Sequence, residues 1–256
     1  PHLMDGAASA PTEGAGPGIG PLRAVGFRID DDPDLVEFAG PNGMVITRDG
    51  AGLAGIGTAA VLSFGPGERH LAAGMARDVL GGMQRTGAVG APAPVAFGAL
   101  PYDPDAGGRL IVPAVQVHRH RDGSRWAVVV GRGEPSEAPV PQPEALLEPP
   151  SRLEVVAARE PRWWMDLVAR ATTRIRAGEL RKVVLAREVT VTADRPVDPR
   201  PALRRLRASY PTCFVSYIDG FLCASPELLV SRDGDVVRAH PMAGTVRKST
   251  RLNSSH

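Results

Sequence analysis

The sequence predicts an α+β fold in which a mainly antiparallel sheet is flanked by helices. Two Asp-Gly turns, Asp219-Gly220 and Asp233-Gly234, separate apolar runs late in the chain, as in an antiparallel meander. Helical and strand patterns also mix along the chain without the strict alternation of a parallel fold. With 256 residues, 43% of them hydrophobic, the chain is long enough for one large domain or two small ones.

The first half of the chain is predicted to be rich in strands. Residues 1–23 are rich in Ala, Gly and Pro without periodicity, and we expect them to be disordered. Between Glu68 and Arg85, apolar residues recur at i+4 spacing, which predicts a helix. Short apolar runs bounded by turn residues such as Asp49-Gly50 predict strands over 26–30, 44–48, 94–100, 109–118 and 125–131.

The second half begins with a connection over residues 132–152, whose six prolines predict irregular or extended structure. Lys182 then opens a predicted strand, after a helix that Gly178 is expected to cap. The stripe that predicts this helix consists of Trp164, Leu167, Val168, Ala171 and Ile175. A short Arg-rich helix and three meander strands are expected over about 199–208, 213–218, 221–231 and 235–245.

The ends of the chain differ in amino-acid composition from its middle. Residues 24–247 are predicted to be the N-terminal part of a single domain, and they contain the Pro-rich connection. The tail "KSTRLNSSH" (248–256) breaks from the composition before it, and we expect it to be non-native.

Composition argues against several classes of partner. A net charge of +2 without a Lys/Arg block argues against nucleic-acid binding. No apolar run is long enough to cross a bilayer, so we expect a cytoplasmic protein without a membrane partner. We also expect a monomer. Cys213 and Cys223 match no zinc or redox pattern; small apolar fillers are favoured over a pair across a hairpin.

Two other patterns have simpler explanations than a functional site. The string "AGLAGIGTAA" (51–60) lacks the residue order of a dinucleotide-binding loop. His118 and His120 lie on one face of a predicted strand and would form half of a metal site. Without a third ligand, a solvated edge strand is the favoured interpretation.

Lys182, Glu227 and the sequence "MAGT" (242–245) together predict a site for a small anion. The lysine opens an apolar run, where a charge is costly to bury, and Glu227 is the only acidic residue of "FLCASPELLV". The small residues of "MAGT" can present backbone N–H groups to an anion. The simpler alternative is an ordinary ion pair between Lys182 and Glu227. In combination, the three features favour acid–base chemistry on a small anionic substrate.

The motifs "GELRKVVLAREV" (178–189), "ASPELLV" (224–230) and "HPMAGT" (240–245) resemble the motif series of the chorismate-utilising enzymes, specifically isochorismate synthases. The stretch "FGALPYDPDAGGRLIVPAVQV" (97–117) is similar to the first half of these synthases, and the resemblance runs from about residue 35 to about 247. Lys182 stands where enzymes that add ammonia to chorismate carry Gln and those that add water carry Lys.

The resemblance implies an isomerisation of chorismate to isochorismate, in siderophore or menaquinone biosynthesis. Lys182 would take a proton from water as it attacks C2 of chorismate. Glu227 would give a proton to the departing C4 hydroxyl, and Gly244 and Thr245 would bind the substrate. Cys223 departs from the family, which commonly has Gly at this position.

The resemblance also implies Mg²⁺ as a cofactor of the complete enzyme, bound by glutamates well beyond the Gly-Thr motif. No acidic residue follows Asp235, so we expect no metal ligands in this chain and an inactive fragment of the enzyme. A salicylate synthase is an alternative, because it shares the Lys and Glu. An aminating enzyme is disfavoured by Lys182. A non-catalytic chorismate-binding relic is the alternative from another class.

Overall fold

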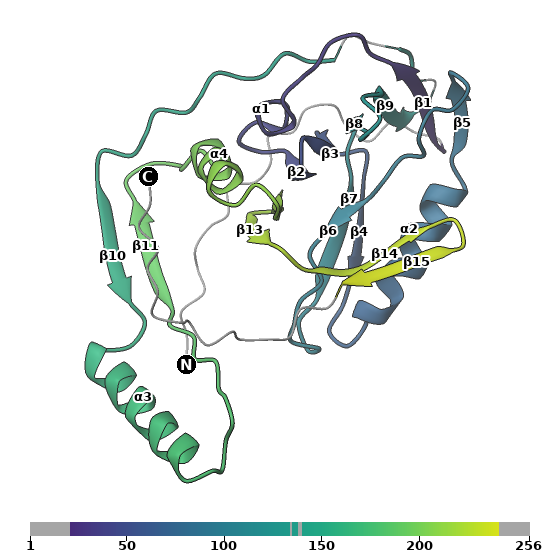
Figure 1. Ribbon diagram of the computed structural model, residues 1–256. Coiled ribbons are helices and arrows are strands. Elements are labelled where there is room, and N and C mark those ends of the chain that lie inside the picture. Colours follow the sequence, from purple (N-terminus) through teal and green to yellow (C-terminus); the bar gives the residue numbers. More distant parts are fainter. Residues whose placement is uncertain (1–20, 134, 138–139, 241–256) are drawn as a thin grey trace. The chain divides into compact units, whose positions relative to one another are not determined.

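A computed structural model describes residues 21–133, 135–137 and 140–240 of the chain (Figure 1). Its largest element is an eight-stranded sheet with the order β13-β12-β2-β3-β8-β9-β1-β5. Neighbouring strands are antiparallel except β1 and β5, which are parallel. In chain order its strands are β1 (Leu22–Arg28), β2 (Met44–Arg48), β3 (Ala51–Ile56), β5 (Gln84–Gly87), β8 (Val115–Arg119), β9 (Arg125–Arg132), β12 (Phe214–Ile218) and β13 (Phe221–Ser225).

Three smaller sheets and a few helices complete the described chain. A three-stranded sheet contains β4 (Ala60–Phe64), β7 (Gly108–Val112) and β6 (Phe97–Gly98). Two hairpins are formed by β10 (Leu153–Ala157) with β11 (Val189–Ala193), and by β14 (Leu228–Asp233) with β15 (Val236–His240). The helices are α1 (Leu35–Ala39), η1 (Arg69–Leu71), α2 (Ala72–Gly81), α3 (Pro161–Arg176) and α4 (Arg200–Ser209). The predicted α+β class is confirmed.

The predicted Asp-Gly turns form hairpins. Asp49 and Gly50 have φ of 53° and 74° and join β2 to β3, while Asp219 and Gly220, at 49° and 83°, join β12 to β13. A two-residue hairpin with positive φ at both positions matches the right-handed twist of its strands. Gly234, with φ of 58°, lies in the loop that joins β14 to β15.

Helices with a clear apolar stripe were predicted well, whereas short elements were missed. The described helices α2, α3 and α4 lie within or close to the predicted ranges. The short helix α1 was not predicted; the Asp34 carboxylate caps it by accepting from the backbone N–H groups of Val36 and Glu37. The string 51–60 contains all of β3, a strand whose Gly55 lies so close to Pro113 that an added Cβ would overlap the proline ring.

Two predicted strands are broken at prolines. The range 109–118 is divided at Pro113 into β7 and β8, which belong to different sheets. The range 221–231 is divided at Pro226 into β13 and β14, again in different sheets. A proline has no N–H to donate to a sheet ladder, so pairing stops there.

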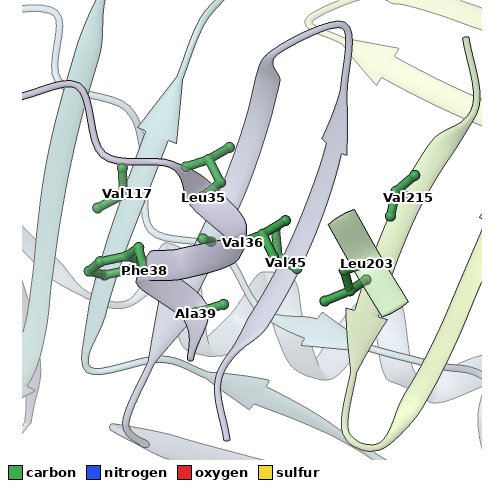
Figure 2. Packing of buried hydrophobic residues seen from close by; sticks show 9 residues of the cluster. Leu35, Val36, Phe38, Ala39, Val45, Val117, Leu203 and Val215 are labelled. Atoms are coloured by element: carbon green, nitrogen blue, oxygen red, sulfur yellow. The ribbon is translucent and has the colours of Figure 1, made fainter. Parts of the chain in front are cut away.

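The main core lies between the eight-stranded sheet and two helices. Figure 2 shows the residues that form it, and all of them are at most 4% exposed. The labelled ones are Leu35, Val36, Phe38 and Ala39 of α1, Val45 of β2, Val117 of β8, Leu203 of α4 and Val215 of β12. Two ion pairs tie α1 to α4: Asp34 with Arg207 at 2.7 Å and Glu37 with Arg204 at 2.6 Å.

The chain divides into two compact units, residues 145–198 and the remainder. The unit 145–198 contains β10, α3 and β11, and none of the residues of α3 is buried. Its hairpin leaves Val155 and Val191, which pair with each other, 65% and 56% exposed. The prediction of one domain over 24–247 stays a prediction. Among the residues that the structure describes, no helix is long and apolar enough to cross a membrane.

Candidate active site

Lys182 lies in the unit 145–198, between the end of α3 and the start of β11. The helix ends at Arg176, and Gly178 has the positive φ, 78°, of the predicted helix terminus. Beyond it, Glu179 forms an ion pair of 2.8 Å with Arg174 in the last turn of α3. These contacts fix the chain just before Lys182.

The apolar strand expected directly after Lys182 is not formed. Residues 182–188 are neither helix nor strand, and β11 begins only at Val189. The side chains of Val183 and Val184 are 40% and 80% exposed, and Lys182 is exposed too. The apolar run has no strand or core to pack against within its unit. The burial expected for this apolar run is therefore absent from the described surroundings of Lys182.

Glu227 lies in the other compact unit, at the corner between β13 and β14. Pro226 ends the pairing of β13, and the backbone N–H of Glu227 donates to Ser225 Oγ at 3.2 Å. The carboxylate side chain is exposed. The structure thus describes the surroundings of Lys182 and of Glu227 separately, each in its own unit. Gly244 and Thr245 lie outside the described residues.

Cys223 precedes this corner in β13 and faces Ser216 of β12, with 3.1 Å between Sγ and Oγ. Because Ser216 occupies the position opposite Cys223, the register does not place Cys213 across the hairpin from it. Both cysteines are free. The expectation of two unpaired cysteines agrees with this register.

The interpretation of His118 as a residue of a solvated edge strand is wrong. β8 lies between β3 and β9 inside the sheet, and His118 is 3% exposed. Its Nε2 lies 3.4 Å from Oε1 of the fully buried Gln116, which also accepts from the N–H of Val95 at 2.9 Å. Burial lowers the pKa of His118 to about 4, helped by the nearby His120.

His118 is therefore a neutral histidine of the sheet interior rather than half of an exposed metal site. Throughout 21–133, 135–137 and 140–240, no group of three or more His, Cys, Asp or Glu side chains is arranged to hold a metal ion. The described residues do not fit a Mg²⁺ site.

Comparison with known proteins gives one family and several relatives. The sequence model of a family described as chorismate binding enzyme matches residues 51–254. A Mycobacterium tuberculosis (strain ATCC 25618 / H37Rv) protein assigned as isochorismate synthase MenF is 34% identical over 172 residues, which are 61% of this chain and 41% of the relative. Isochorismate synthase MenF of Bacillus subtilis (strain 168) is 32% identical over 184 residues, 60% of this chain and 38% of the relative.

A solved structure from Bacillus anthracis, titled as a 2,3-dihydroxybenzoate-specific isochorismate synthase, DhbC, has a TM-score of 0.52 at 22% identity. The match covers 84% of this chain and 52% of that chain, and at this identity it shows the fold alone. The chain spans about two fifths of the length of the curated relatives it matches, 41% and 38% for the two above.

Proposed function

Because the chain belongs to the chorismate-binding enzyme family, we propose that it is part of an isochorismate synthase. The observation that carries the proposal is its similarity to isochorismate synthases of two organisms, at 34% and 32% identity. In the reaction, water forms a bond to C2 of chorismate while the C4–O bond breaks and the ring double bonds shift. The water released at C4 balances the water added at C2, so the reaction is an isomerisation.

Lys182 is the proposed general base, which takes a proton from the attacking water. Composition supports this role, because Lys182 and Lys248 are the only lysines among the 30 Lys and Arg residues of the chain. An arginine keeps its proton in proteins, so the other cations cannot replace a lysine as a base.

Glu227 is the proposed general acid, which gives a proton to the hydroxyl that leaves C4. Gly244 and Thr245 are the proposed substrate-binding residues, through the backbone and the hydroxyl. Both Lys182 and Glu227 are exposed, whereas acid–base catalysis gains from a site that excludes water. We therefore expect turnover to need further residues that cover both side chains, and we expect the 256-residue chain alone to be inactive.

Mg²⁺ is the expected cofactor of the complete enzyme, where it would neutralise a carboxylate of chorismate. Since the described residues do not fit a metal site, its ligands are expected elsewhere, and the proposed steps are those of Lys182 and Glu227 alone.

A non-catalytic chorismate-binding protein is the second candidate. The exposure of Lys182 and the lack of a metal-ligand cluster in the described part of the chain favour it. The two candidates differ in whether chorismate is only bound or also converted.

The proposed base can be tested through its own NMR signal. Reductive methylation with ¹³C-formaldehyde labels Lys182, Lys248 and the N-terminal amine of the 256-residue chain, together with any lysine that a longer version adds. A Lys182→Arg variant identifies the Lys182 signal, because that signal alone is missing from it. In a version of the protein extended to the length of its relatives, we expect chorismate to shift the Lys182 signal, because the proposed base lies beside the bound substrate. A Lys182 signal that chorismate leaves unchanged would refute the proposed base.

Turnover gives the second readout. Chorismate is incubated with the extended protein and Mg²⁺, and isochorismate is separated by liquid chromatography. We expect Lys182→Ala and Glu227→Gln to lower kcat by about 100-fold or more, the usual contribution of a general acid or base. Normal turnover in either variant would remove that residue from the mechanism, and binding without any product would favour the second candidate.

A further inference from the structure

An ion pair joins two sheets of the larger compact unit. Arg109 of β7 donates through Nε to Asp219 Oδ2 at 2.7 Å and through Nη2 to Oδ1 at 2.5 Å. This two-bond fork fixes the orientation of both side chains, which a single-point contact does not. Asp219 is the first residue of the turn between β12 and β13, in the eight-stranded sheet. The pair thus connects the three-stranded sheet to the corner of the β12–β13 hairpin.

Apolar contacts lie beside the pair. Ile218, the residue before Asp219, is 7% exposed and clusters with Phe97 of β6 and Met44 of β2, and Ile111 of β7 packs against the same cluster. The backbone of Asp219 has a φ of 49°, which a non-glycine residue seldom adopts. The turn is therefore held in one conformation by Ile218 on its buried side and by Arg109 at its rim.

The β12–β13 hairpin leads directly to Glu227. β13 ends the order of the eight-stranded sheet and pairs with β12 alone among the described strands. An edge strand with one neighbour is held less firmly than an interior strand. Pro226 then ends the pairing, and the N–H of Glu227 donates to Ser225 Oγ. The direction in which β13 runs from its turn therefore determines where Glu227 lies.

We propose that Arg109 and Asp219 are positioning residues for Glu227: they hold the β12–β13 hairpin against the three-stranded sheet and so fix the course of β13. The role given to Glu227 rests on the proposed function. The geometric part of the inference, that the pair fixes residue 227 in space, does not.

Electrostatics and access agree with this role. The Arg109 guanidinium lowers the pKa of Asp219, through its hydrogen bonds first, so the carboxylate keeps its charge at neutral pH. The pair borders an open groove of about 400 Å³ whose walls include Ser63, Pro101 and Phe221. Because water and salt reach a pair in an open groove, high salt should weaken it.

The position of residue 227 can be measured directly. In a Cys213→Ala, Cys223→Ala background, spin labels on Glu227→Cys and on Gln84→Cys of β5, an exposed residue at the opposite edge of the sheet, report one distance distribution by double electron–electron resonance. We expect Arg109→Gln to broaden or shift this distribution, and Arg109→Lys, which keeps the positive charge without straining the turn at Asp219, to change it less. Arg195→Gln, which breaks the 2.6 Å pair with Glu148 in the other unit, is the matched control and should change nothing.

Hydrogen exchange measures how readily the β12–β13 hairpin opens when the Arg109–Asp219 pair is removed. In Arg109→Gln, amides of residues 214–225 should exchange roughly fivefold faster, the scale expected for losing one partly exposed ion pair. Amides of β3 and β8 should keep their rates. A distance distribution at residue 227 and hairpin exchange rates that are both unchanged in Arg109→Gln would overturn the inference.

Turnover separates this inference from the proposed function. In an extended protein that converts chorismate, Arg109→Gln should lower kcat by roughly fivefold with KM within about twofold, and Arg109→Lys should lower kcat less. Full kcat in Arg109→Gln despite a displaced residue 227 would overturn the positioning role. If the extended wild-type protein converts no chorismate, the proposed function fails, while the distance measurement still decides the geometric part.

Discussion

The buried His118 makes acid destabilise the protein well above the range in which carboxylates titrate. An unfolded histidine has a pKa of 6.5, whereas burial lowers that of His118 to about 4. Below pH 6.5 the unfolded chain therefore takes up a proton that the folded chain does not. Titration of His118 therefore leaves the stability unchanged above pH 6.5 and lowers it as the pH falls from 6.5 to about 4. Below pH 4 this residue causes no further loss of stability.

The magnitude follows from the two pKa values. Each pH unit between them corresponds to about 1.4 kcal/mol, so the full effect is about 3 kcal/mol, most of which is already lost at pH 4.5. That is a large fraction of the roughly 5–15 kcal/mol by which domains are stable. The pH range and the size of this stability loss distinguish His118 from Asp34 and Asp219. Both aspartates have pKa values lowered from 3.8, so the stability that they contribute is lost only below about pH 3.8.

Urea unfolding, followed by tryptophan fluorescence at pH 7.5, 6.0, 5.0 and 4.5, measures the effect. We expect the free energy of unfolding of the wild-type chain to fall by about 2–3 kcal/mol over this range. His118→Gln, which keeps a polar side chain without a titratable ring, should lose much less. The matched control is His70→Gln, because His70 is exposed. A parallel loss of stability in wild type and His118→Gln would refute the role given to the buried ring.

Three substitutions test the core and its helix. Phe38→Ala, in the cluster of Figure 2, should cost about 3–5 kcal/mol of unfolding free energy in urea titrations, because it leaves a cavity. Asp34→Ala removes the cap of α1 and the pair with Arg207 and should cost about 1–2 kcal/mol; Glu68→Ala, at an exposed turn, is its control. Gly55→Ala should cost about 1–3 kcal/mol because its Cβ meets the Pro113 ring, and a stability within 0.5 kcal/mol of wild type would contradict that close approach.

Local sequence signals predicted the elements whose structure is decided locally. The turns at Asp49-Gly50 and Asp219-Gly220 need residues that tolerate positive φ, and the sequence supplies them. The stripe from Trp164 to Ile175 formed α3 as predicted, although none of its residues is buried. Periodicity thus identifies a helix without identifying what covers it.

Long-range contacts decided what the sequence analysis missed. His118 was predicted to lie in a solvated edge strand, but β3 and β9 flank β8 and bury its side chain and that of Gln116. Arg109 and Asp219 are separated by 110 positions in the chain, and no local pattern connects them. The prolines offered a usable signal: Pro113 and Pro226 each mark a change of sheet, and dividing the apolar runs there would have given β7, β8, β13 and β14.

Lys182 shows that a motif can suggest a reaction without predicting how the residue of that motif is surrounded in the fold. The apolar residues that follow it have strong strand propensity, yet a strand needs a partner whose N–H and C=O groups face it. β10 ends at Ala157, which pairs with Val189, and one further bond runs from the N–H of Ala158 to the carbonyl of Glu188 at 3.2 Å. β10 therefore offers no partner to residues 183–187. The apolar run is therefore left exposed in its unit. If Lys182 is a base, the residues that bury it must come from beyond β10 and α3, and slower reductive methylation of Lys182 in the extended protein than in the 256-residue chain would show that they do.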